Sequence, residues 1–106
     1  MKTYIEENKQ RFLDELFDLL RIPSVSADRK YKGDVRNAAE FVKTKLLAAG
    51  AQIATLYETD GHPIVFAELL IDKNLPTILV YGHYDVQPPD PLELWHTPPF
   101  EPEIRN

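Results

Sequence analysis

Three short stretches of strand-forming residues lie close together in the second half of the chain, at residues 52–57, 64–70 and 77–81. They are rich in β-branched and aromatic side chains, which favour β-strands. The two connections between them are turn-forming by composition. Both are too short for a crossover helix, since parallel neighbours need a connection of about a dozen residues or more. We therefore predict that successive strands are antiparallel neighbours in a mixed sheet.

Two amphipathic helices are predicted ahead of these strands. Residues 3–20 carry apolar side chains at three- and four-residue spacing from Phe12 onward, which marks one buried helical face. Pro23 ends this helix, because the residue before a proline is pushed out of the α region. The second helix is predicted between Asp34, as its N-cap, and Gly50, which suits the left-handed backbone after a helix. The fold class is therefore α/β, with helices packed on the sheet.

The composition argues against several classes of protein. A formal net charge of −5 and the lack of a basic stripe argue against a nucleic-acid partner. The absence of cysteine excludes disulfides and thiolate metal sites. The N-terminus has no apolar core of signal-peptide length, and no apolar run approaches membrane-spanning length. We therefore expect no membrane association and a cytoplasmic location.

A histidine and an aspartate follow the third predicted strand. Gly82 breaks the apolar run, and His83 and Asp85 come directly after it. Side chains two residues apart on an extended chain point to the same side. The carboxyl end of a strand is also a favoured place for chemistry in an α/β sheet. The pair therefore suits a metal-bound imidazole whose second ring nitrogen is held by a carboxylate.

Two other interpretations of this pair stay open. One is a general base that works without a metal, and the other is a structural hydrogen-bonded pair, since a lone His-x-Asp is common by chance. A metal-free hydrolase lacks a well-placed nucleophile, because Ser24 and Ser26 are predicted to lie in a distant exposed loop. His62, in the turn between two strands, and His96, in a proline-rich segment, are weaker candidates and are predicted to be surface residues.

Four groups of residues occur in an order that resembles a known family. They are Leu-Arg-Ile-Pro-Ser-Val-Ser at 20–26, Ala-Ala-Glu-Phe at 38–41 with Gly50, Tyr-Gly-His-Tyr-Asp-Val-Gln-Pro at 81–88, and Trp95 with Pro-Phe-Glu-Pro at 99–102. The set resembles the N-terminal part of the co-catalytic dizinc peptidases and amidohydrolases. That family includes carnosine-type dipeptidases, aminoacylases, acetylornithine deacetylases and succinyl-diaminopimelate desuccinylases. The match looks closest to the dipeptidase branch.

The resemblance implies hydrolysis of an amide bond, in a dipeptide or an N-acyl amino acid, at a site with two zinc ions. His83 would be a ligand to one zinc ion, and Asp85 would be the acidic residue that orients it. A glutamate would act as general base on a metal-bound water. Manganese and cobalt also suit a site of histidine and carboxylate ligands. The family's dimerisation domain implies a homodimer for the full-length protein.

The chain is short for this family. In relatives, the remaining metal ligands and the glutamate base lie beyond the position of Asn106, and a catalytic zinc site usually takes three protein ligands. We therefore expect residues 1–106 to be the N-terminal part of a catalytic domain that binds zinc weakly and is inactive when isolated. The alternative is a non-catalytic interaction module that keeps the scaffold of the family and docks on a partner through an open sheet edge.

Overall fold

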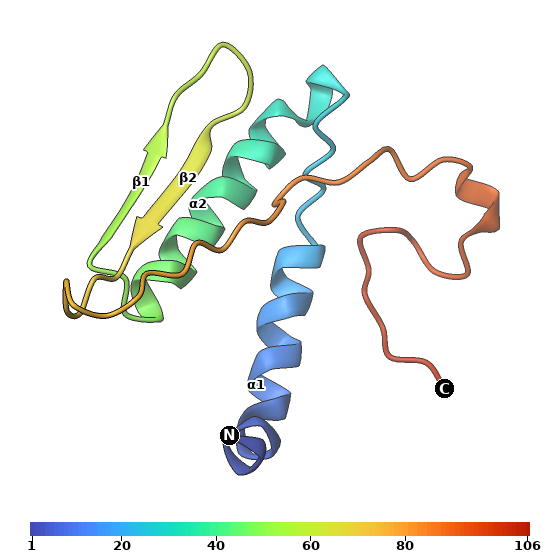
Figure 1. The fold of residues 1–106 in the computed structure, drawn as a ribbon. Coiled ribbons are helices and arrows are strands. Elements are labelled where there is room, and N and C mark those ends of the chain that lie inside the picture. The colour runs from blue at the N-terminus through green and yellow to red at the C-terminus, as the bar shows by residue number, and fades with distance from the viewer. The chain divides into compact units, whose positions relative to one another are not determined.

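The computed structural model describes all 106 residues of the chain, and they form two compact units. The first unit comprises Met1–Pro23 and Pro89–Asn106, and the second comprises Ser24–Pro88. None of the helices has the length and apolar character needed to span a lipid bilayer. In chain order, the elements are α1 (Lys2–Leu20), the short helix η1 (Arg29–Tyr31), α2 (Lys32–Ala48), β1 (Ile53–Tyr57), β2 (Ile64–Glu68) and the short helix η2 (Leu92–Leu94) (Figure 1).

Helix α1 forms where the apolar spacing predicts it. It spans Lys2–Leu20, and the chain leaves the helix at Arg21, two residues before Pro23. Its apolar face is only partly covered, since no residue of α1 is fully buried and Leu16 is 47% exposed. The helix is confirmed, but its predicted buried face is not, because the rest of its unit is irregular chain that covers little of the helix.

Helix α2 begins earlier than the sequence predicts. It continues directly from η1, which is capped by Asp28 through a hydrogen bond of 3.0 Å from the backbone N–H of Lys30. Asp34 lies inside the first turn, where its charge suits the helix dipole, so the predicted N-cap role of Asp34 is wrong. The predicted end of the helix is confirmed, because Gly50 has a φ of +111°.

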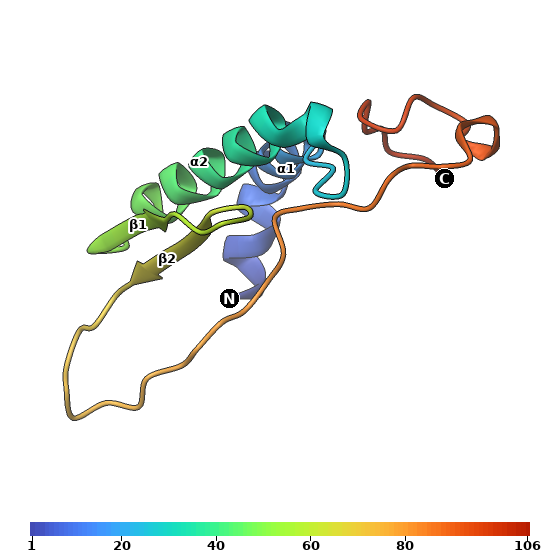
Figure 2. The same cartoon turned by 90° about the horizontal axis from the view of Figure 1, so that it is seen from above.

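Strands β1 and β2 form an antiparallel hairpin, as their short connection predicts. The register pairs Ile53 with Glu68 and Tyr57 with Ile64. In the turn, the hydroxyl of Thr59 donates a hydrogen bond to the carbonyl of the residue three positions on, at 2.8 Å. Helix α2 packs along the hairpin and contacts both strands (Figures 1 and 2). Helices beside an incomplete sheet confirm the α/β class.

The third predicted strand, at residues 77–81, does not form. The sheet has two strands only, and the segment is almost fully exposed, with Ile78 at 84% and Leu79 at 91%. Figure 2 shows that the chain leaves β2 in a wide loop that extends away from the sheet. A strand is stable only where a neighbour satisfies its N–H and C=O groups, and these residues have none. The one parallel pairing, which a mixed sheet would need, is an isolated bridge between Val25 and Val86.

The core of the second unit lies along one face of α2. Val35, Ala38 and Ala39 are completely buried, and Val25, from the loop before η1, is 1% exposed. Protein interiors are packed as densely as organic crystals, so a larger side chain at the two alanines would have little free volume to enter.

Replacing Ala38 by leucine tests this packing. Ala38→Leu should lower the free energy of unfolding by about 1–3 kcal/mol, because extra methylenes strain a well-packed core. Ala48→Leu, at an exposed position of the same helix, is the matched control and should change it by less than about 0.5 kcal/mol. Urea unfolding followed by circular dichroism measures both, and equal effects would contradict the burial of Ala38.

Two glycine-to-alanine substitutions test the positive φ of Gly50. Gly50→Ala should destabilise the fold by about 1–2 kcal/mol, because an L side chain is strained in this backbone region. Gly33→Ala, inside α2 with open space around the added methyl, should instead stabilise by about 0.5–1 kcal/mol. Thermal unfolding measures both changes, and a stabilising effect at Gly50 would contradict its left-handed conformation.

Candidate functional site

His83 and Asp85 are hydrogen-bonded to each other. His83 Nδ1 lies 2.9 Å from Asp85 Oδ1. An ionised carboxylate only accepts, so Nδ1 carries the proton, and Nε2 of the neutral ring keeps its lone pair. The side chain of His83 is 71% exposed and that of Asp85 is 33% exposed. This geometry is compatible with a metal-ligating imidazole that a carboxylate orients.

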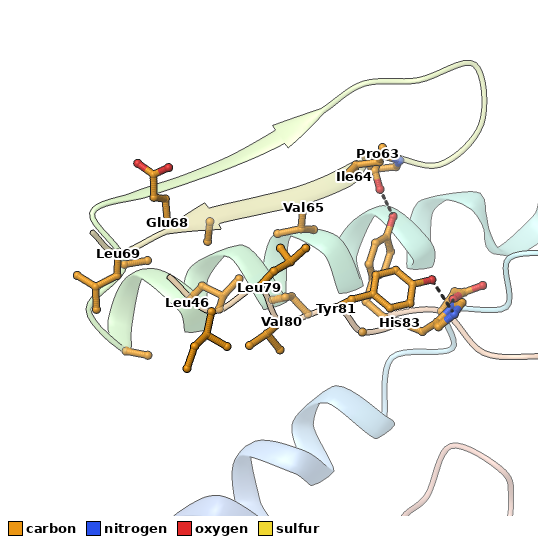
Figure 3. Close-up of a pocket in the computed structure, with 18 residues that line it drawn as sticks. Leu46, Pro63, Ile64, Val65, Glu68, Leu69, Leu79, Val80, Tyr81 and His83 are labelled. Carbon is orange, nitrogen blue, oxygen red and sulfur yellow. Dashed lines mark hydrogen bonds and ion pairs between the residues drawn. The ribbon is translucent and has the colours of Figure 1, made fainter. Parts of the chain in front are cut away.

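Tyr81 lies against the same imidazole ring. Its hydroxyl is 3.2 Å from His83 Nε2, and the two rings meet edge to face with centroids 5.6 Å apart (Figure 3). Because Nε2 of the neutral ring accepts, the Tyr81 hydroxyl donates. Tyr81 is 82% exposed, so the surrounding protein constrains its side chain little. A metal ion that binds Nε2 can therefore displace the hydroxyl.

The loop around Val25 holds the segment that carries this pair. Val25 and Val86 form a parallel bridge, and the N–H of Val86 donates to the carbonyl of Ser24 at 3.0 Å. The hydroxyl of Ser24 donates to the carbonyl of Tyr84 at 2.9 Å, across 60 residues of sequence. Ser24 and Val25 are buried. The prediction of a distant exposed loop is therefore wrong, because a contact this far apart in sequence leaves no local pattern.

Two neighbouring side chains act on the carboxylate of Asp85. A hydrogen bond from the Ser26 hydroxyl, followed by one from His83, lowers the pKa of Asp85, while partial burial opposes the shift. Asp85 therefore stays ionised, and able to accept from His83, at a lower pH than an ordinary aspartate does.

His62 and Tyr84 connect the hairpin turn to the same region. His62 Nε2 lies 2.9 Å from the carbonyl oxygen of Ser26, and a carbonyl only accepts, so Nε2 donates. The hydroxyl of Tyr84 donates to the carbonyl of Pro63, and burial raises the pKa of Tyr84, so the donor stays protonated. The prediction that His62 is a solvated loop residue is wrong, because its ring is half-buried and joins the turn to the loop at Ser26.

A divalent metal ion fits this chemistry through one protein ligand. No group of three or more His, Cys, Asp or Glu side chains comes together in the chain, whereas a catalytic zinc site usually takes three protein ligands. His96 is exposed, as predicted, and lies in the other compact unit. His83, with its carboxylate, is thus the residue whose geometry suits a metal ligand.

An apolar groove of about 680 Å³ extends from α2 to the candidate pair. Its walls include Leu46 of α2, Val65 of β2 and the exposed Leu79, with His83 at one end and Glu68 at the other (Figure 3). Asp85 also lines the groove. Contiguous exposed apolar surface of this kind is typical of an interaction surface or a ligand-binding groove.

The chain is similar to known enzymes over nearly its whole length, although no protein-family model matches it. The Cys-Gly metallodipeptidase dug1 of Schizosaccharomyces pombe is 32% identical over 96% of this chain and 23% of the relative. The Cys-Gly metallodipeptidase DUG1 of Candida albicans is 35% identical over 91% of this chain and 22% of the relative. A succinyl-diaminopimelate desuccinylase of Xylella fastidiosa is 29% identical over 89% of this chain and 22% of the relative.

The fold matches a solved structure of the same kind. The dipeptidase Dug1p of Saccharomyces cerevisiae aligns with a TM-score of 0.83 and 30% identity, over 92% of this chain and 22% of that one. The chain is therefore similar to the metal-dependent dipeptidases and amidohydrolases that its motifs resemble. It spans less than a quarter of the length of the Cys-Gly metallodipeptidases that it matches.

The lowered pKa of Asp85 predicts a pH-dependent stability. A carboxyl group whose pKa is lower in the folded state stabilises that state above its unfolded pKa of about 3.9, and this contribution is lost as the pH falls through the folded value. Asp85→Asn should therefore lose less free energy of unfolding than the wild type between about pH 6 and about pH 3. Urea titrations at both values measure the difference. Asp60→Asn, in the exposed hairpin turn, is the control. If Asp85→Asn lost as much free energy of unfolding on acidification as the wild type, the lowered pKa would be contradicted.

Proposed function

We propose that residues 1–106 are the N-terminal part of the catalytic domain of a metal-dependent peptidase that cleaves the amide bond of dipeptides or N-acyl amino acids. The observation that carries this proposal is the hydrogen bond of 2.9 Å between His83 and Asp85. It lies within the motif where the family resemblance expects a metal ligand and its orienting carboxylate. The similarity to Cys-Gly metallodipeptidases supports the choice of a dipeptide as substrate.

In this proposal, His83 would hold the metal through Nε2, and Asp85 keeps the ring in the tautomer whose proton is on Nδ1. The Tyr81 hydroxyl, which donates to Nε2, would have to move aside. A bound divalent ion would supply Lewis-acid activation of the amide carbonyl and of a water molecule. Zinc is the proposed metal, with two ions in the complete site, and manganese or cobalt suits the same ligand types.

The remaining ligands and the general base are proposed to come from segments outside residues 1–106. The absence of a three-ligand cluster within the chain supports this, as does the exposed apolar strip at residues 78–80. The isolated chain is accordingly proposed to bind zinc weakly and to be inactive. The homodimer and the cytoplasmic location that the sequence suggests stay predictions for the full-length enzyme.

Hydrolysis assays test the proposal directly. The purified 106-residue chain should not hydrolyse Cys-Gly above the blank, whereas the full-length product of the gene should do so with added zinc or manganese and stop with a chelator. In that enzyme, His83→Gln should lower kcat/KM by more than about 100-fold, the upper end of losses seen for outer-shell partners of metal ligands.

His96→Gln, the same substitution at an exposed histidine of the other unit, is the matched control and should leave kcat/KM unchanged. Wild-type activity in His83→Gln would contradict the ligand role. Metal-dependent hydrolysis by the 106-residue chain alone would contradict the incomplete site.

The competing function is a non-catalytic interaction module, which the same exposed strip at residues 78–80 favours. The gene sequence beyond codon 106 separates the two functions. The peptidase needs further carboxylates and a histidine to complete its metal site, whereas a module needs none of them.

A further inference from the structure

We propose that His62 is a positioning residue that holds the loop at residues 24–26 and, through that loop, the segment that carries His83 and Asp85. The inference rests on the proposed function, because it concerns how a metal ligand is held in place. His62 Nε2 lies 2.9 Å from the carbonyl oxygen of Ser26, across 36 residues of sequence. A carbonyl only accepts, so Nε2 donates its proton to this bond and is not free to bind a metal.

The hairpin turn fixes the place of the His62 ring. The hydroxyl of Thr59 accepts from the N–H of Gly61 at 3.0 Å and donates to the carbonyl of His62 at 2.8 Å. The next residue, Pro63, is buried, and a residue before a proline is confined to extended backbone conformations. The half-buried ring therefore extends from a backbone with few alternatives, so its bond to Ser26 costs little additional conformational entropy.

Ser26 passes this constraint to the segment that carries the site. Its N–H donates to the carbonyl of Val86, the residue after Asp85, at 3.4 Å. A bond of this length lies outside the usual range for N–H donors and contributes little by itself. The shorter bond from His62 to the carbonyl of Ser26 therefore does more to fix the backbone of Ser26, and with it the partner of Val86.

Tyr84 gives the hairpin turn a second contact with the candidate site. Its hydroxyl donates to the carbonyl of Pro63, the residue after His62. Side chains alternate along an extended chain, so Tyr84 can face the turn while His83 and Asp85, which are bonded to each other, share the opposite side. The turn thus contacts the loop through His62 and the site segment through Tyr84.

Two substitutions of His62 in the full-length product of the gene separate the hydrogen bond from the ring. His62→Phe keeps a ring without a donor, and His62→Gln keeps an N–H donor on a side chain of similar reach. His62→Phe should weaken Zn²⁺ affinity about fivefold, equivalent to about 1 kcal/mol, the size of one neutral hydrogen bond. His62→Gln should stay within about twofold of the wild type. His96→Phe, at an exposed histidine of the other unit, is the matched control and should leave the affinity unchanged.

The tautomer of His83 gives a readout that a purely structural role of His62 would not change. In metal-free protein at mildly alkaline pH, ¹⁵N chemical shifts should report the Nδ1–H form of His83 in the wild type and in His62→Gln. In His62→Phe they should report a mixture of both tautomers. Thermal unfolding of the same samples shows that each variant is folded at the temperature of the measurement.

Tyr84→Phe, which removes the hydroxyl bonded to Pro63, is the second variant. It breaks the other contact of the same turn, so it should show the same loss of affinity and the same mixture of tautomers where His62→Phe does not fold. Tyr57→Phe, at an exposed tyrosine of β1, is its control and should change neither.

His83→Gln in the same series separates two kinds of failure. If His83→Gln binds zinc as the wild type does, the proposed function fails. If His83→Gln loses zinc while folded His62→Phe keeps wild-type affinity and tautomer, only the role of His62 is overturned. Equal losses in His62→Phe and His62→Gln would also overturn it, since they would show that the hydrogen bond to Ser26 is not the cause.

Discussion

The pairing of residues 24–26 with residues 84–86 is the contact on which the candidate site depends. It consists of the bridge between Val25 and Val86 and the bond from the Ser24 hydroxyl, and it joins segments 60 residues apart. Because Ser24 and Val25 are buried, these hydrogen bonds are shielded from water and gain strength from the low local dielectric. These contacts hold the backbone of residues 84–86, next to which His83 lies.

The same contact makes the hairpin part of the site. Helix α2 packs on β1 and β2, and the turn between these strands donates from His62 to the carbonyl of Ser26. The N–H of Ser26 donates in turn to the carbonyl of Val86, next to Asp85, which is hydrogen-bonded to His83. A continuous series of contacts therefore runs from the buried face of α2 to the imidazole, and the orientation of an exposed histidine depends on the small core of its unit.

The unit that carries the site buries few large apolar side chains and leaves several others exposed. Val25 and Val35 are its largest fully buried side chains, whereas Ile78, Leu79 and Val80 are more than 80% exposed. Residues 77–81 were predicted as a strand because their composition suits one, but no neighbouring strand in this chain pairs with them.

The sequence alone determined the helices, the hairpin and the pairing of His83 with Asp85, because the patterns that predict them are local. Three-and-four spacing, turn residues and the two-residue offset of a histidine and an aspartate all act within a few positions of one another. Only the tertiary structure decided that Ser26 and His62 belong to the site and that residues 77–81 stay unpaired. The physical reason is that these outcomes depend on partners 36 or more residues away, or on a neighbouring strand, and no local period encodes such contacts.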